Sequence, residues 1–111
     1  MLPSRSTTVL DLRLPEQSKD DDICARISFT HDSSADSATL AVSGLIYGEC
    51  SYQFGFYLAR LIQIEARRWY LDLGDLEVLS FQGAILLSSF IEKLHRRGRK
   101  FQLRALNDAV N

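Results

Sequence analysis

The residues best suited to chemistry lie in the junction Ser80-Phe81-Gln82-Gly83, between a short apolar stretch and a long amphipathic pattern. A serine and a glutamine stand there beside the backbone N–H groups that a helix leaves unpaired at its N-terminus. Together with the helix dipole, such N–H groups form a good site for anionic groups. If the preceding residues form a strand, the junction lies where open α/β sheets usually bind their ligands. We therefore expect the binding surface here.

Patterns that would indicate catalysis, a metal or a nucleotide are missing from the sequence. It contains no paired carboxylates, no Walker-type glycine loop, no metal-spaced histidine or cysteine set and no nucleophile elbow. His31 and Asp32 could form a ligand pair, but a single imidazole in a loop is more often solvated. Asp72 and Asp75, on an expected strand and turn, are interpreted as structural. We therefore expect no enzyme activity, no cofactor and no metal.

The amino-acid composition limits the classes of protein to which the chain can belong. A chain of 111 residues with 46% hydrophobic and 24% charged residues is typical of one soluble globular domain. Its net charge of −1 predicts no general attraction to nucleic acid or to acidic membranes. No apolar run reaches the roughly 20 residues that span a bilayer. The first residues also lack the apolar core of a secretory signal.

The cysteines and the basic cluster bear on the cellular compartment and on the classes of partner. Cys24 and Cys50 form no CxxC motif, and we interpret them as small core residues rather than as a disulfide, which fits a reducing compartment. The expected location is the cytoplasm. The cluster Arg96-Arg97-Gly98-Arg99-Lys100 has a structural explanation, because positive charge complements the dipole at a helix C-terminus. We therefore expect no nucleic-acid partner and no direct insertion into a membrane.

Hydrophobic periodicity predicts one domain that follows an N-terminal segment. The segment, residues 1–22, contains a short strand at 9–14 and then a polar linker, and the domain covers residues 23–111. The expected elements of the domain are strands at 25–30 and 39–46, a helix at 52–67, a strand at 69–73, a helix from the Ser80 junction to a stop at Gly98, and a strand at 101–106.

The order of these elements predicts an α/β fold. Adjacent strands joined by a short loop pair antiparallel, whereas a strand–helix–strand unit gives parallel neighbours with the helix on one face. We therefore expect a β-β-α-β-α-β domain with a mixed, largely parallel sheet and helices packed mainly on one face. Ser51 or Glu49 is expected to cap the first helix. Phe56 and Tyr57 on that helix are expected to pack in the core.

The run from Leu71 to Ala84 resembles the centre of STAS domains, the anti-sigma-factor antagonist family. Members typically show there a strand ending in Leu-Asp-Leu, a small or polar residue, and later Asp-Ser-Ser-Gly at the start of a helix. Residues 94–103 and the early strand at 40–45 continue the resemblance. By order of elements the similarity covers roughly residues 23–110, and it implies a single STAS-like domain.

The resemblance also implies a non-enzymatic regulatory module that binds a protein partner. In the sigma-regulating branch, an anti-sigma kinase phosphorylates the second serine of Asp-Ser-Ser-Gly and so breaks the complex. Here Ser80, Phe81, Gln82 and Gly83 occupy those positions. Because Gln82 cannot be phosphorylated, the standard switch is expected to be absent, unless Ser80 accepts the phosphate instead.

Two residues of the junction have competing interpretations. Ser80 is either a helix N-cap or a phosphoacceptor, and the cap is favoured because it needs no partner enzyme. Phe81 could be an exposed anchor for a partner, or it could tuck against the helix as an N-terminal staple. The expected partner-binding residues are Ser80, Phe81, Gln82, Gly83, Gly48 and Glu49.

The leading functional interpretation is an anti-sigma-factor antagonist-like protein in bacterial signal transduction and transcription regulation, with an anti-sigma factor kinase as partner. The alternative is a small STAS subunit of a larger assembly, such as an ABC-type lipid transporter with its ATPase, or a stress-signalling scaffold. Family members usually carry a further helix after the last strand, which residues 107–111 only begin. We expect a homodimer, the N-terminal segment or a larger complex to cover the surface that this helix would occupy.

Overall fold

The computed structural model describes residues 5–13 and 23–104, which form six strands and two helices. The polar linker expected at 14–22 and the C-terminal residues 105–111 lie outside the described residues. The elements in chain order are β1 (Arg5–Arg13), β2 (Ile23–Asp32), β3 (Ser37–Ile46), α1 (Glu49–Leu61), β4 (Arg68–Asp72), β5 (Leu76–Leu79), α2 (Phe81–Arg96) and β6 (Lys100–Arg104).

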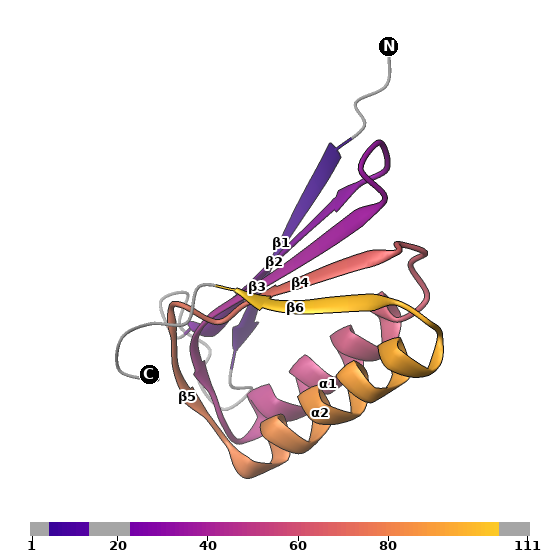
Figure 1. The fold of residues 1–111 in the computed structure, drawn as a ribbon. Helices are drawn as coiled ribbons and strands as arrows, with labels where there is room; N and C mark the ends of the chain where they lie inside the picture. The colour runs from indigo at the N-terminus through magenta and orange to yellow at the C-terminus, as the bar shows by residue number, and fades with distance from the viewer. Residues whose placement is uncertain (1–4, 14–22, 105–111) are drawn as a thin grey trace.

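The strands form one mixed sheet in the order β1-β2-β3-β4-β6, and β5 pairs with β3 beyond the residues that pair with β4. The β1–β2 and β2–β3 pairs are antiparallel, whereas β3–β4, β3–β5 and β4–β6 are parallel. Both helices lie on one side of the sheet (Figure 1). Parallel pairs need a crossover, and the two helices supply it on the same face. The predicted α/β fold class is therefore confirmed.

The N-terminal strand is longer than the 9–14 segment that the apolar alternation predicts. It pairs antiparallel with β2 from Arg5 onward, although residues 5–10 are exposed and only Leu12 is buried. Polar cross-strand contacts support this edge, including an Asp11–Arg26 ion pair at 2.7 Å. The hydrogen bond from Arg26 lowers the pKa of the Asp11 carboxyl. An edge strand held by polar pairs lacks the alternation that reveals half-buried strands.

The first helix begins and ends earlier than the predicted 52–67. It covers Glu49–Leu61, and Gly48, with φ 55°, occupies its N-cap position. The expectation that Ser51 or Glu49 caps this helix is wrong, because both residues lie inside its first turn. A glycine can adopt the positive φ that this sharp turn out of β3 requires, whereas a serine cannot do so without strain.

The second helix ends at the predicted glycine. Gly98 has φ 73°, and the Arg99 N–H donates to the Leu94 carbonyl at 3.0 Å, which closes the last turn. The side chains of Leu87, Phe90 and Leu94 are buried, as the predicted apolar stripe requires. No helix in the described ranges is long and apolar enough to cross a membrane.

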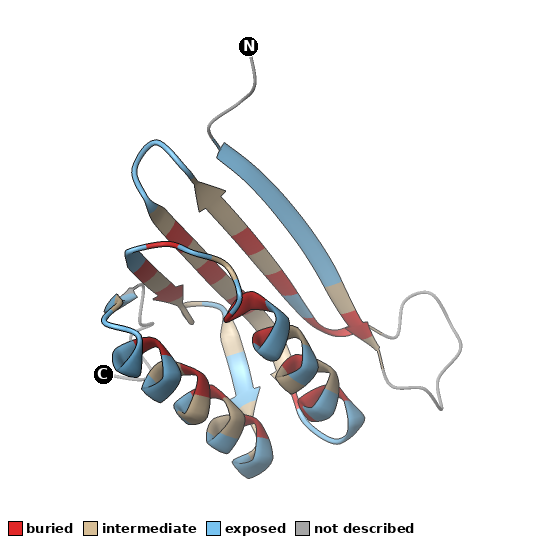
Figure 2. Ribbon diagram, turned by 90° about the vertical axis from the view of Figure 1, so that its right-hand side faces the viewer, coloured by how far each residue is buried: buried red, intermediate tan, exposed pale blue. Residues whose placement is uncertain are grey.

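The core lies between the sheet and the two helices, where buried residues alternate along the strands (Figure 2). Trp69 on β4 is its largest fully buried side chain. The centroid of its ring lies 5.9 Å from that of Phe29 and 5.5 Å from that of Phe90, and the contact with Phe90 is T-shaped. Its indole N–H donates to the Ala66 carbonyl at 3.0 Å, so the buried polar atom is satisfied. Trp69 thus joins the antiparallel strands, the parallel strands and α2.

Cys24 and Cys50 are buried in the core as predicted, but they form a disulfide, so the prediction that they are unpaired is wrong. Cys24 lies near the start of β2 and Cys50 in the first turn of α1. A separation of 26 residues gives no indication of pairing, because only the packing of α1 on the sheet brings the sulfur atoms together. Cysteine usage therefore no longer argues for a reducing compartment.

The central place of Trp69 gives a stability prediction. Trp69→Ala should lower the free energy of unfolding by about 3–5 kcal/mol, because it leaves a cavity among three packed elements. Urea denaturation followed by circular dichroism measures this change. The control, Phe56→Ala, removes an aromatic side chain that is 74% exposed. It should change stability by less than about 0.5 kcal/mol, and equal losses in the two variants would contradict the assignment of Trp69 to the core.

Candidate functional site

Both helices begin at the same end of the sheet. β3 ends at Ile46 before α1, β5 ends at Leu79 before α2, and these two residues pair in parallel. The Ser80 N–H donates to the Ile46 carbonyl at 2.8 Å and so continues the pairing to the start of α2. The first turns of the two helices therefore lie side by side (Figure 1). We call the surface formed by Gly48, Glu49, Ser80, Phe81 and Gln82 the helix-start surface.

Ser80 closes the start of α2 and links it to α1. Its backbone is extended at the N-cap position, with φ −64° and ψ 162°, and its hydroxyl accepts a hydrogen bond from the Gly83 N–H at 3.0 Å. The same hydroxyl lies 2.7 Å from the hydroxyl of Ser51, which is buried on α1. The N-cap interpretation of Ser80 is therefore confirmed. The sequence does not reveal the contact with Ser51, which tertiary packing creates.

Gly83 lets α2 pack closely on the strand ends beneath it. The residue is buried, and a Cβ placed on it would lie 2.9 Å from side-chain carbons of both Ile46 and Leu79. Ordinary carbon–carbon contacts are about 3.5–4.0 Å, so a larger residue would move its neighbours or the helix start. Gly83 therefore positions the helix-start surface from below rather than contributing a contact of its own.

Phe81 and Gln82 are both exposed, and Phe81 most of all, with 83% of its surface open to solvent. The alternative in which Phe81 tucks against the helix as a staple is wrong. Ser80 at the N-cap directs the first helical residues outward, while Gly83 faces the strands. An exposed aromatic ring next to an exposed amide is a suitable anchor for a partner, because it offers apolar area together with a donor and an acceptor.

Gly48 and Glu49 complete the helix-start surface from the α1 side, and both are exposed. The Gly48 carbonyl accepts from the Ser51 N–H at 3.0 Å, which starts the first turn of α1. The Glu49 carboxylate lies in that turn, where a negative charge complements the helix dipole. Of the six predicted partner-binding residues, the structure places Gly83 below this surface, and Ser80 is half-buried in it.

The structure exposes apolar side chains on the helices that were not predicted to lie at the surface. Phe56, expected in the core, is 74% exposed, so that prediction is wrong, whereas Tyr57 is half-buried and packs against the core. The sequence pattern could have predicted this exposure, because Tyr52 and Phe56 have i,i+4 spacing and fall outside the buried stripe of α1. The large apolar residues that are exposed on the two helices are Tyr52, Phe56, Phe81 and Ile85.

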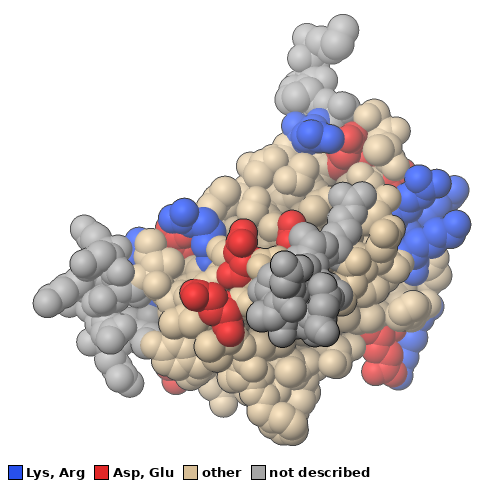
Figure 3. Space-filling view, turned by 60° about the vertical axis from the view of Figure 1, so that its left-hand side comes forward, with Lys and Arg blue, Asp and Glu red and all other residues tan. Residues whose placement is uncertain are grey.

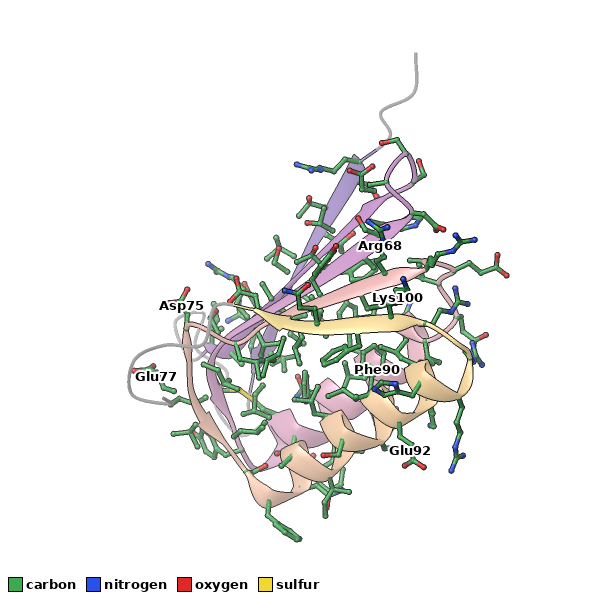
Figure 4. The ribbon with its side chains drawn as sticks, in the orientation of Figure 1. Arg68, Asp75, Glu77, Phe90, Glu92 and Lys100 are labelled. Atoms are coloured by element: carbon green, nitrogen blue, oxygen red, sulfur yellow. A yellow bond between two sulfur atoms is a disulfide. The ribbon has the colours of Figure 1, made fainter. Side chains whose placement is uncertain are left out.

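Acidic residues lie on a neighbouring part of the surface, along β5 and the turn before it. In Figure 3 they gather near the centre of the face turned forward, and basic side chains lie toward its edges. Asp75 and Glu77 project from this part of the chain (Figure 4). The Asp72 carboxylate accepts from the Gly74 N–H at 2.9 Å, and the Asp75 carbonyl accepts from the Gly44 N–H at 3.1 Å. The first contact confirms a structural role for the Asp72 side chain, whereas the contact of Asp75 is made by its backbone.

The His31–Asp32 pair shapes a loop. The Asp32 carboxylate accepts from the Ser34 hydroxyl at 2.7 Å and from the backbone N–H groups of Ser34 and Ala35. The Ser34 hydroxyl, and then the Ala35 N–H, lowers the pKa of this carboxyl. Within residues 5–13 and 23–104, no group of three or more His, Cys, Asp or Glu side chains could hold a metal ion.

The role of Ser80 gives a second prediction. Ser80→Ala should lower the free energy of unfolding by about 1–2 kcal/mol, because it removes the cap and leaves the buried Ser51 hydroxyl without this partner. Thermal and urea unfolding measure the loss. Ser88→Ala, an exposed change on the same helix, is the matched control and should be neutral or slightly stabilising. In the double variant with Ser51→Ala the losses should be less than additive; strict additivity would contradict the hydroxyl contact.

Comparisons with known proteins support the fold. No family model matches the sequence, and no curated protein matches it. Solved structures do match, among them a crystal structure of an antisigma-factor antagonist STAS domain from Rhodobacter sphaeroides. The TM-score is 0.60 at 11% sequence identity, over 74% of this chain and 87% of that chain. Similarity at this identity concerns the fold, and the chain has the mixed α/β architecture of STAS domains.

Proposed function

We propose that this protein is a non-enzymatic regulatory module that binds a protein partner through the helix-start surface, in the manner of an anti-sigma-factor antagonist. The observation that carries the proposal is the exposure of Phe81 above a fixed base, formed by the Ser80 cap and the buried Gly83. The STAS-like fold supports it, since the matched Rhodobacter sphaeroides domain is an antisigma-factor antagonist. The partner that fits this reading best is an anti-sigma factor kinase.

The physical case rests on preorganisation. Phe81 leaves 83% of its surface in water, and covering apolar area contributes about 25 cal/mol per Å². Aromatic residues in this position carry a large share of binding energy when a partner buries them fully. The backbone beneath Phe81 is already fixed by the hydrogen bond from Gly83 to Ser80, so binding costs little further ordering. Gln82 and Glu49 then supply polar groups that orient the partner.

We propose further that binding does not depend on serine phosphorylation. Gln82 stands where the STAS resemblance places the phosphoacceptor, and it has no hydroxyl. Ser80 is the remaining candidate, but its hydroxyl is half-buried and contacts both the Gly83 N–H and the Ser51 hydroxyl. A phosphate there would disrupt both contacts and the helix start that they hold. A complex with this protein would therefore be constitutive.

One observation favours a second candidate function, a small STAS subunit of a larger assembly such as an ABC-type lipid transporter. Tyr52, Phe56 and Ile85 extend the exposed apolar surface beyond Phe81, across both helices. Large exposed apolar patches mark permanent interfaces more often than transient ones. In that case a transporter ATPase or a stress-signalling scaffold would cover the outer face of both helices.

Photo-crosslinking in the native cells identifies the partner and separates the two functions. A photoreactive phenylalanine analogue at position 81 should capture one main protein, whose identity by mass spectrometry is a kinase-like regulator or a transporter subunit. The same analogue at Val9, an exposed apolar position on the distant β1 edge, is the control. Equal capture from both positions would contradict docking at the helix starts.

Affinity measurements with the captured partner then test the site. Phe81→Ala should weaken binding at least tenfold, because a buried aromatic anchor contributes about 2 kcal/mol or more. Val9→Ala should change binding less than twofold. If the protein acts as an antagonist, Phe56→Ala should change binding as little as Val9→Ala does. If it is a subunit of a larger assembly, Phe56→Ala should weaken binding as much as Phe81→Ala does. Unchanged binding in Phe81→Ala would overturn the proposed site. Intact-mass analysis of the native protein should show no phosphate.

A further inference from the structure

The end of the molecule opposite the helix-start surface is rich in arginine and lysine, from the C-terminus of α2 and the starts of β4 and β6. Four of the arginines there are engaged by neighbouring groups of the chain. The contacts are Arg67 with Asp36 at 3.8 Å, Arg96 with Glu92 at 2.7 Å, Arg97 with the Ile62 carbonyl at 2.8 Å and Arg99 with the Ala66 carbonyl at 2.9 Å.

Arg68 and Lys100 are different. They are directly opposite one another in the parallel β4–β6 register, where strands lie about 4.8 Å apart. Both are exposed, and no ion pair in the described part of the chain involves either side chain. Like charges placed directly opposite on neighbouring strands destabilise a sheet. This pair therefore has no structural role that offsets its repulsion, in contrast to the surrounding arginines.

The two cations lie on the face of the sheet that the helices leave uncovered. Figure 4 shows Arg68 and Lys100 above β4 and β6, while Phe90 lies on the helix side. The next pair in the register, Tyr70 and Gln102, lies on the same face because side chains alternate along a strand. These four residues, together with Trp69 and Phe101, line an open hollow of about 360 Å³ on the surface.

The polar side chains that line this hollow donate hydrogen bonds, and none of them is a carboxylate. A guanidinium fork, an ammonium and an amide offer many N–H groups, and no acidic residue is among the lining residues. Two carboxylates on the same face, those of Asp32 and Asp72, accept hydrogen bonds from groups outside the hollow. Asp32 binds the Ser34 hydroxyl at 2.7 Å, and Asp72 binds the Gly74 N–H at 2.9 Å. The hollow therefore attracts anions and lacks the charge to neutralise itself.

The backbone that carries these donors is held firmly from the other side. Trp69, between Arg68 and Tyr70, is buried against Phe29 and Phe90. The Lys100 N–H donates to the Arg67 carbonyl at 2.8 Å, which fixes the start of β6 beside that of β4. A site on two anchored strands keeps its donors in place before a ligand arrives, and this reduces the cost of binding.

We propose that this hollow, which we name the open-face site, binds a phosphate monoester group, whether a soluble molecule or a lipid headgroup carries it. A phosphate monoester has a charge of about −1.5 to −2 at neutral pH, which matches the two cations. The Arg68 fork binds two phosphate oxygens at once and Lys100 a third. Tyr70 and Gln102 contact the rest of the molecule. The open-face site lies at the opposite end of β4 from the helix starts, so it is a second site and does not depend on the protein-docking function.

Titration with defined probes tests the open-face site on the intact protein. Inorganic phosphate, glucose 6-phosphate and glucose are added to ¹⁵N-labelled protein, and amide shifts are followed by NMR. Glucose 6-phosphate should shift the amides of Tyr70, Lys100 and Gln102, more strongly than phosphate does, and glucose should shift none. Binding should weaken as salt increases. The absence of shifts with both phosphates at millimolar concentration, together with no vesicle binding, overturns the proposal, as does an equal response to glucose.

Variants show whether the two cations carry the binding. Arg68→Gln with Lys100→Gln should weaken binding at least tenfold, and Arg96→Gln, which removes an exposed arginine of the same end, should change it less than twofold. Should the double variant not fold, Gln102→Glu places a negative charge in the hollow and should weaken binding similarly. Unchanged binding in the folded variants overturns the proposal. Phe81→Ala should bind the probe normally, so this site and the docking function fail independently.

The source of the phosphate is distinguished with vesicles. Phosphatidylcholine vesicles with phosphatidic acid present a phosphate monoester on a lipid headgroup, whereas pure phosphatidylcholine vesicles do not. Co-sedimentation with the first alone, lost in the Arg68 and Lys100 variant, would identify a lipid headgroup as the source. Binding of glucose 6-phosphate without co-sedimentation would identify a soluble molecule. Both outcomes support the open-face site.

Discussion

The parallel pairing of β3, first with β4 and then with β5, is the constraint on which the rest of this structure depends. Residues Ser37 to Ala41 pair with β4, and Gly44 to Ile46 pair with β5, so one strand guides two successive segments. Because Ile46 and Leu79 are partners, the helices that follow must start next to each other. The helix-start surface is therefore a direct result of strand pairing rather than of any contact between loops.

The helix-start surface combines a tightly packed base with an exposed top. Beneath it, Gly83 leaves no room for a side chain, and the hydroxyls of Ser80 and Ser51 join the two helices. Above it, the Phe81 side chain is exposed to water, and the folding of the chain itself gives no reason for this exposure. An exposed phenylalanine adds little to the stability of its own chain, and together with the exposed Tyr52, Phe56 and Ile85 on the same two helices it marks a candidate interaction surface. This contrast within one helical turn is the basis of the proposed protein-docking function.

The two ends of the sheet differ in charge and in the use of that charge. Asp72 ends β4, Asp75 lies in the turn after it and Glu77 lies on β5, whereas the arginine-rich end lies at the starts of β4 and β6. A net charge of −1 hides this separation, because it sums over both ends. Whether a cation is structural or available depends on its neighbours: Arg97 and Arg99 cap carbonyls, whereas Arg68 faces Lys100 across two strands.

Local patterns in the sequence determined the types of the predicted elements, the α/β class and the position of the helix start at Ser80, because periodicity and capping act over a few residues. They also located Gly98 as a helix stop. Strand β5 was not among the predicted elements, because its four residues are defined by pairing with the distant β3. What only the tertiary structure decided depends on residues distant in sequence. The Cys24–Cys50 bond, the contact between Ser51 and Ser80, the exposure of Phe56 and Phe81, and the Arg68–Lys100 pair all arise when strands pair and helices pack. Composition and spacing along the chain do not encode such contacts, because which side chains meet is set by register and layer packing.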